Sequence, residues 1–204
     1  MKNEDLIESV RDLRDLIGEP LSKLKNKITN QLDEYQKSYV VNSPLIFVST
    51  SDKDGNQEVS PKGDEAGFVK VADSNTLIIP ERPGNKLAFG FENILSNGQI
   101  GLIFLVPGLT ETLRVSGSAR LSKSPELLEE LSAQGKPALL CTIVTIRKCW
   151  LHCGKAFIRS KLWNPEAWSN GLESQYTEQV ANAMNVDEDI VKRVVLDDYE
   201  NNLY

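Results

Sequence analysis

The apolar positions near the amino end of this chain recur every three or four residues, which is typical of amphipathic helices. The two sets are Leu6, Val10, Leu13 and Ile17, followed by Leu21, Leu24, Ile28, Leu32, Tyr35 and Tyr39. Gly18 and Pro20 separate them, because both residues interrupt a helix. The pattern therefore predicts two amphipathic helices ahead of the main body.

From Pro44 the pattern changes to short apolar runs separated by turn residues, which predicts strands. The runs are residues 45–50, 57–60, 68–72, 76–80, 99–106, 112–121 and 139–151. Helical spacing returns in residues 85–97, in a short capped helix after Ser124, and in the acidic stretch after Trp163. About six or seven short strands with single helices between them favour a small antiparallel barrel, mainly β with α additions.

With 204 residues, 22.7 kDa and 40% hydrophobic residues, the chain is long enough to bury one substantial core. We predict a single domain over residues 1–204. Its parts would be N-terminal helices in residues 1–40, the barrel core in 41–163 and C-terminal helices in 164–204.

Charge is distributed unevenly along the chain, whose net charge is −6. Residues 1–34 and 164–204 together carry 8 basic and 17 acidic side chains, whereas residues 35–163 carry 15 and 12. Residues 131–165 contain no acidic side chain but include Lys136, Arg147, Lys148, Lys155, Arg159 and Lys161. Acidic ends disfavour a nucleic-acid partner, so the cationic stretch predicts a small bound anion such as a phosphate.

No apolar run approaches the ~20 residues that a membrane span needs, and the first residues lack the order of a signal peptide. We therefore expect a cytoplasmic protein without a membrane partner. Three cysteines, Cys141, Cys149 and Cys153, fit a reducing compartment and are expected to be buried neutral thiols. His152 between two of them gives too few ligands for zinc, so no metal site is predicted.

Candidate ligand-binding residues occur in three segments. Ser60 and Lys62 belong to Ser60-Pro-Lys-Gly-Asp64, which is equally well explained as a surface turn. Arg82, Asn85 and Lys86 lie at the start of the helix predicted for residues 85–97, where the dipole favours an anion or a plain cap. On the strand 112–121, alternation places Leu113, Val115 and Ala119 inward and Thr112, Arg114, Ser116 and Arg120 on the other face.

Planar side chains accompany these cations. Trp150, Trp163 and Trp168 lie near the basic stretch, where a tryptophan either stacks on a planar ligand or covers the core. Phosphate with a planar ring suggests a nucleotide-like cofactor. The sequence has no Gly-x-Gly-x-x-Gly and no Walker motif, which argues against a Rossmann-type or P-loop site.

Residues 44–163 resemble the pyridoxamine 5′-phosphate oxidase-like, FMN-binding split-barrel superfamily, and most closely a subgroup of uncharacterised FMN-dependent flavoproteins. The matching stretches are Ser60-Pro-Lys-Gly-Asp64, Ile79-Pro-Glu-Arg-Pro-Gly-Asn85, Asn93-Ile-Leu95, Ile100-Gly-Leu-Ile-Phe-Leu-Val-Pro-Gly108, Glu111-Thr-Leu-Arg-Val-Ser-Gly-Ser-Ala-Arg120 and His152-Cys-Gly-Lys-Ala-Phe-Ile-Arg-Ser160. The resemblance implies a six-stranded split barrel that forms a homodimer, with FMN between the subunits.

The resemblance also implies roles for individual residues. Lys62, Arg82 and Lys86 would contact the FMN phosphate, with Ser60 and Asn85 as hydrogen-bond donors. Thr112 and Arg114 match the strand that approaches the flavin ring, and Lys155, Arg159 and Ser160 match a segment that reaches the cofactor. Two departures stand out: Asn85-Lys86 replaces the usual Arg-Lys pair, and the chain continues to Tyr204 without the family's Trp…Arg-Leu-x-Pro-type tail, which argues against pyridoxamine phosphate as substrate.

The resulting hypothesis is an FMN-dependent oxidoreductase acting on a small molecule. An alternative from another class is a non-catalytic carrier of flavin or haem, in which His152, the single histidine, would be the only histidine available as an iron ligand. A general flavin reductase is a third.

Overall fold

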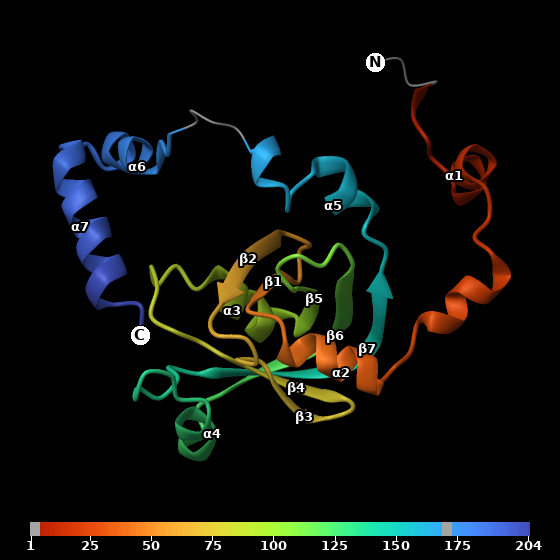
Figure 1. Ribbon diagram of the computed structural model, residues 1–204, viewed down its shortest axis with the longest axis horizontal. Coiled ribbons are helices and arrows are strands. Elements are labelled where there is room, and N and C mark those ends of the chain that lie inside the picture. Colours follow the sequence, from red (N-terminus) through yellow and green to blue (C-terminus); the bar gives the residue numbers. More distant parts are fainter. Residues whose placement is uncertain (1–4, 169–172) are drawn as a thin grey trace.

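The computed structural model describes residues 5–168 and 173–204, and in that part seven strands form one antiparallel sheet of order β2-β1-β5-β6-β7-β4-β3 (Figure 1). The strands are β1 (Leu45–Ser51), β2 (Gln57–Gly63), β3 (Lys70–Asp73), β4 (Thr76–Pro80), β5 (Gln99–Leu105), β6 (Thr112–Ser122) and β7 (Cys141–His152). The helices are α1 (Val10–Ile17), α2 (Glu34–Val41), α3 (Phe89–Ser96), α4 (Pro125–Glu130), α5 (Lys155–Ser160), α6 (Tyr176–Met184) and α7 (Glu188–Asn201), with 3-10 turns η2 (Ser22–Lys27) and η3 (Pro165–Ala167). The predicted fold class, mainly β and antiparallel with terminal helices, is confirmed.

The sheet curls into an open barrel whose two edges are β2 and β3 (Figure 1). Its inner face holds the core, because alternate residues of each strand point to one side of a sheet. On β6 the inward residues Leu113, Val115 and Ala119 are buried, as the alternation predicted. Each fully buried Leu or Phe side chain contributes about 1.5–3 kcal/mol to stability. Helix α3 contacts β1, β2, β5 and β6 and covers one end of this core.

The second helix predicted near the amino end is wrong as a single element. The chain forms the 3-10 turn η2, then an extended segment, and only then α2. The interruption occurs because Thr29 pairs with Cys149 of β7. The Thr29 amide donates to the Cys149 carbonyl at 3.0 Å, and the Thr29 carbonyl accepts from the Cys149 amide at 2.8 Å. A capping box of Asp33 and Gln36 then starts α2.

The helix predicted for residues 85–97 also begins later than expected. Lys86 and Ala88 have positive φ angles of 63° and 58°, so the backbone is left-handed where a right-handed helix would have to start. The Asn85 side chain accepts a hydrogen bond from the Leu87 amide at 3.1 Å, which fixes a turn instead. Helix α3 therefore starts only at Phe89.

The terminal segments extend away from the barrel. Helix α1 and the α6–α7 pair stand on opposite sides of it, apart from the sheet (Figure 1). Helices α6 and α7 pack on each other through Ala181 and Val191, their buried residues. Within the described ranges, no helix has the length and apolarity that crossing a membrane would require.

Candidate functional site

The predicted ligands fall into two separate regions of the molecule. The first, which we call the loop cleft, lies between β2 and the loop of residues 81–88. It consists of two adjoining cavities of about 150 and 390 Å³. The cavities share Ser60, Lys62, Glu81 and Asn85, and Arg82 lines the larger one. The fold thus gathers four of the five predicted phosphate ligands in one place.

Lys62 of the loop cleft is already paired with a carboxylate. Its Nζ lies 2.5 Å from Glu81 Oε2, and both side chains are largely buried. The same ammonium group lies 4.9 Å from the centre of the Phe91 ring, a cation–π contact from α3. The sequence prediction recognised Lys62 but missed Glu81, which follows β4 and faces Lys62 across the cleft.

Arg82 is held even more firmly. Its Nε donates to Asp64 Oδ2 at 2.7 Å and its Nη1 donates to the Leu131 carbonyl at 2.9 Å. The Asp64 side chain is only 4% exposed and also accepts from the Tyr204 hydroxyl at 2.8 Å. Burial alone would raise the pKa of Asp64, but the hydrogen bonds from Arg82, Tyr204 and the Glu65 amide outweigh it, so this pKa lies below its usual value.

Lys86 does not join the other predicted ligands. It is exposed and is absent from the lining of both cavities of the loop cleft. The expectation that Arg82, Asn85 and Lys86 open a helix is wrong, because all three precede α3 in a loop. The helix dipole therefore does not act on an anion through these residues.

The second region is a cavity of about 330 Å³ on the outer face of the sheet, which we call the outer-face cavity. It contains four predicted residues, Thr112, Arg114, Lys155 and Arg159. Its remaining lining residues are Phe47, Ile103, Leu105, His152, Cys153, Ala156 and Phe157.

Strand register explains how this cavity is assembled. Ile103 of β5 lies directly opposite Phe47 of β1 on one side and Arg114 of β6 on the other. Residues opposite one another on neighbouring strands share a face, so these three side chains form one row on the outer face. Thr112 pairs in the same way with His152 of β7. Phe47 was missed, although alternation with buried Ile46 and Val48 points it outward.

Electrostatically, the outer-face cavity is positive. Among the residues that the structure describes, Arg114, Lys155 and Arg159 line it and no acidic side chain does. The Nε of Arg114 is buried and has no hydrogen-bond partner within the described residues. Burial and then the charges of Arg114 and Lys27 lower the pKa of His152, so its imidazole is neutral at pH 7. A buried donor without a partner is costly, which makes this cavity suited to a bound acceptor or anion.

Helix α5 closes one side of the outer-face cavity, and Gly154 sets its position. A Cβ atom at residue 154 would lie 2.3 Å from Thr110 Oγ1, so only glycine lets the chain pass Thr110 at this point. Phe157 of α5 stacks on Trp163 with ring centres 5.8 Å apart. The apolar pattern does not predict this helix, which has only six residues.

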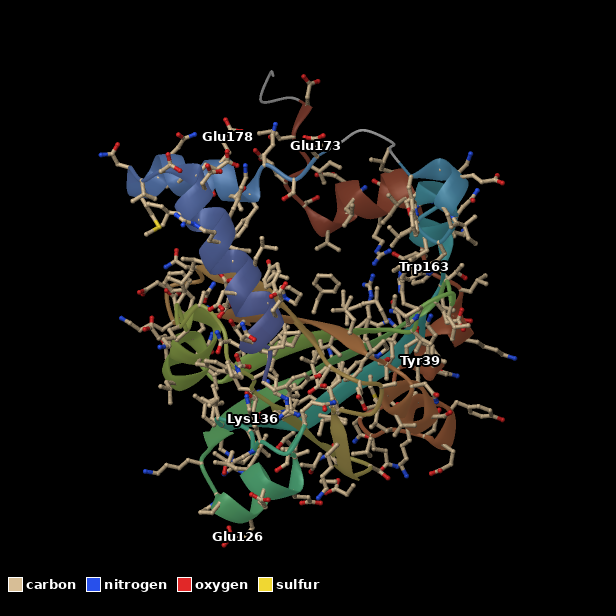
Figure 2. The ribbon with its side chains drawn as sticks, turned by 60° about the vertical axis from the view of Figure 1, so that its left-hand side comes forward. Tyr39, Glu126, Lys136, Trp163, Glu173 and Glu178 are labelled. Atoms are coloured by element: carbon tan, nitrogen blue, oxygen red, sulfur yellow. The ribbon has the colours of Figure 1, made fainter. Side chains whose placement is uncertain are left out.

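Ser160 is not brought to either region. Its hydroxyl donates to the Phe157 carbonyl within α5 at 3.1 Å. In Figure 2, Trp163 marks the α5 side of the molecule, and Lys136, which lines a small cavity with Arg82, lies below the end of α7.

The cysteines differ from the expectation in one case. Cys141 and Cys149 are buried, and burial raises the pKa of both thiols. Cys153 is exposed at the outer-face cavity, so the prediction that all three are buried is wrong for this residue. In the described parts of the chain, no three His, Cys, Asp or Glu side chains cluster closely enough to hold a metal.

The sequence model described as pyridoxamine 5′-phosphate oxidase matches residues 32–153, more than half of the chain. Among solved structures, the chain is similar to HupZ of Group A Streptococcus, with 22% identity over 59% of this chain and 93% of that one and a TM-score of 0.48. It is also similar to a protein of Lactobacillus delbrueckii described as a putative pyridoxamine 5′-phosphate oxidase, with 26% identity, 60% and 95% coverage and a TM-score of 0.47. An FMN-binding protein of Syntrophomonas wolfei has 14% identity, 57% and 80% coverage and a TM-score of 0.42. No curated protein matches the chain.

Proposed function

The chain belongs to the pyridoxamine 5′-phosphate oxidase family, and on that premise we propose that it binds FMN and acts as an FMN-dependent oxidoreductase on a small molecule. The solved proteins similar to it include one described as FMN-binding, which supports this cofactor. The substrate is not pyridoxamine phosphate on our proposal, because the chain continues through α6 and α7 where that enzyme has its substrate-binding tail. Its free cysteines agree with a cytoplasmic location.

The observation that carries the proposal is the guanidinium group of Arg114, whose Nε is buried and has no partner among the described residues. The cavity that Arg114 lines is also lined by Lys155, Arg159 and several apolar side chains. Phe47, Ile103 and Phe157 offer flat or branched apolar surfaces to an isoalloxazine ring. The carbonyl and nitrogen acceptors of the pyrimidine part of that ring would accept hydrogen bonds from the guanidinium group of Arg114. These residues therefore fit a flavin.

The loop cleft would hold the phosphate ester. Ser60, Lys62, Arg82 and Asn85 all line it, but Glu81 and Asp64 balance the charges of the two cations. A phosphate there would accept hydrogen bonds from those N–H groups of Lys62 and Arg82 that do not take part in these ion pairs. Each charge-assisted hydrogen bond contributes about 1.5–3 kcal/mol, so three of them approach the ~8 kcal/mol of micromolar binding before ordering costs.

One FMN would be held by two copies of the chain in a homodimer. The loop cleft and the outer-face cavity share no residue, and Val48 lines the first while its neighbour Phe47 lines the second. Consecutive strand residues point to opposite faces, so the two regions of one protomer face different directions. A phosphate in the cleft of one protomer and a ring in the cavity of its partner would join them.

When bound, FMN supplies hydride transfer at a ring nitrogen. The chain's own residues would bind the cofactor, orient its ring and set the electrostatic potential around it. Arg114 would offset negative charge at the pyrimidine end of the ring, and Lys155 and Arg159 would strengthen the positive potential there. The neutral His152 would offer a hydrogen bond without adding charge.

A carrier of haem is the second candidate, and the position of His152 favours it. This histidine is neutral at pH 7, as an iron ligand must be, and it lines a cavity with apolar walls and three cations suited to propionate groups. Adding haemin and looking for a histidine-ligated Soret band that is lost in His152→Ala separates this candidate from the flavin proposal. Consumption of NADH with free flavin would instead indicate a general flavin reductase.

The test of the proposal is the identity of the bound ligand. The full-length protein is purified, denatured, and the released small molecules are identified by mass spectrometry. We expect FMN, with flavin absorbance in the folded protein. A colourless preparation whose absorbance and fluorescence do not change when FMN is added would refute the proposal.

A further inference from the structure

The chain exposes far more surface than its size requires. Its accessible area is 14183 Å². A folded monomer of 22.7 kDa exposes about 9,500 Å², so the excess is about 4,700 Å². The terminal segments extend from both sides of the barrel (Figure 1) and expose many large apolar side chains. Surface of this extent calls for a partner.

Helix α1 illustrates the problem. It has eight residues and none of them is buried. Its apolar residues lie on one side, and Val10 and Leu16 are 74% and 73% exposed. An isolated helix shorter than about 12–15 residues is marginal in water, because its few hydrogen bonds do not offset the cost of nucleation. Helix α1 therefore needs a surface that covers its apolar side.

The α6–α7 pair also has an apolar side that no described residue covers. The two helices bury Ala181 and Val191 against each other, and Tyr204 ties their end to Asp64 of the barrel. Val180 and Val195 are half-buried, but most large apolar side chains in residues 176–203 stay exposed: Tyr176, Met184, Val186, Ile190, Val194, Leu196, Tyr199 and Leu203. The pair thus presents an apolar surface that the chain itself does not cover.

We propose that both terminal segments pack on a second copy of this chain, so that α1 and α6–α7 form the outer clamps of the homodimer. The area supports this occupant. Obligate dimers bury about 2,000–5,000 Å² summed over both partners, so the excess of about 4,700 Å² on each chain is more than enough to supply such an interface. Placing the clamps on opposite sides of the barrel lets each protomer hold its partner at two points. The inference deepens the proposed homodimer and rests on it for the arrangement of the flavin site.

The experiment uses two pairs of substitutions on the full-length protein. Leu13→Gln with Ile17→Gln makes the apolar side of α1 polar, and Ile190→Gln with Val194→Gln does the same on α7. The control for α1 is Arg11→Gln with Asp15→Gln, which keeps the net charge and alters the exposed polar side of the same helix. The control for α7 is Glu200→Gln. Molecular mass is measured by light scattering over a dilution series, with circular dichroism on the same samples.

We expect a wild-type dimer whose dissociation constant rises at least tenfold with either apolar pair and stays within threefold with the controls. All four apolar residues are exposed in one chain, so the substitutions leave the barrel intact, and an unchanged strand signal verifies this. A wild-type monomer would overturn the inference, as would a dimer insensitive to both apolar pairs. A monomer that sediments with lipid vesicles would assign the same surfaces to a membrane.

Bound flavin is quantified in parallel and keeps the two proposals distinguishable. If the apolar substitutions dissociate the dimer in a preparation that never contained flavin, the result supports the clamps and does not support the cofactor. A stable dimer that depends on the clamps but binds no flavin leaves the clamps supported and contradicts the cofactor.

Discussion

Arg82 and Asp64 form an ion pair across 2.7 Å beside the loop cleft, with the Asp64 side chain 4% and the Arg82 side chain 15% exposed. Tyr204 completes the arrangement, because its hydroxyl donates to the other carboxylate oxygen and its ring lies 5.9 Å from the guanidinium group. Lys136 donates in turn to the Tyr204 backbone oxygen at 2.5 Å. The cation that the sequence assigns to a phosphate is thus first a structural element of the protein.

Replacing Arg82 by Met should therefore lower stability. It leaves the Asp64 carboxylate buried without its cation, which costs about 3 kcal/mol in the free energy of unfolding, the lower end for a buried pair. Urea denaturation measures the loss, and Arg82→Met combined with Asp64→Leu should recover most of it. The control is Lys53→Met, whose exposed pair with Asp54 contributes little. Equal losses in Arg82→Met and Lys53→Met would contradict the assignment.

Acid should weaken the same pair. The pKa of Asp64 is lower in the folded protein than in the unfolded chain, so its contribution is complete above the unfolded value of about 4 and is lost as the pH falls through the folded value. Asp64→Asn removes this contribution. The free energy of unfolding of the wild type should exceed that of Asp64→Asn at pH 7, and the difference should shrink steadily below pH ~4. A difference that does not depend on pH would show that the charge of Asp64 is not what stabilises the fold.

Flavin binding should depend on Arg114. Removing one charge-assisted hydrogen bond costs about 1.5–3 kcal/mol, so Arg114→Ala should raise the dissociation constant of FMN roughly 10- to 100-fold. Fluorescence titration of protein freed of its ligand measures this change. Arg120→Ala is the matched control, because Arg120 lies on the same face of β6 and is absent from the lining of the outer-face cavity. The same affinity in both variants would remove Arg114 from the site.

Gly154→Ala should displace α5 and disturb the outer-face cavity. The added methyl group would lie 2.3 Å from Thr110 Oγ1 and 2.8 Å from the Thr110 carbonyl carbon, so the backbone has to move. Overpacking of this kind costs about 1–3 kcal/mol, and each kcal/mol lowers Tm by about 2–4 °C in a chain of this size. Gly101→Ala serves as control, since the atom nearest to its added methyl group, Ser49 Cβ, would lie at 3.8 Å. A Tm unchanged in Gly154→Ala would show that α5 adapts freely.

The thiols should react in two classes. Cys153 is exposed and open to a reagent. Cys141 and Cys149 are buried and their pKa values are raised, so a reagent cannot reach them and their thiols stay protonated. Titration with an aromatic disulfide reagent should modify one thiol in the native protein and all three after denaturation. Cys153→Ser should abolish the native reaction. Rapid reaction of two or more thiols under native conditions would contradict the burial of Cys141 and Cys149.

Much of the fold could be predicted from the sequence, because apolar spacing is a local property. The alternation on β6 placed Leu113 and Val115 inward and Arg114 outward, and each lies as predicted. Predicted elements were wrong where a contact with a distant residue set the backbone conformation. Thr29 is not helical as predicted but forms a β-bridge with Cys149, which is 120 residues away in the sequence. The spacing of apolar residues within the segment cannot reveal a contact with a residue so far away in the sequence.

The sequence by itself determined which residue types the chain offers: cations, hydroxyls and aromatic side chains in the order typical of the family. Only the tertiary structure decided which of them are free to act. It paired Lys62 with Glu81 and Arg82 with Asp64, and it left the Nε of Arg114 buried with no hydrogen-bond partner in the described part of the chain. The physical reason is that an electrostatic contact depends on distance and burial in space, whereas sequence spacing fixes only the face of a helix or strand on which a side chain lies.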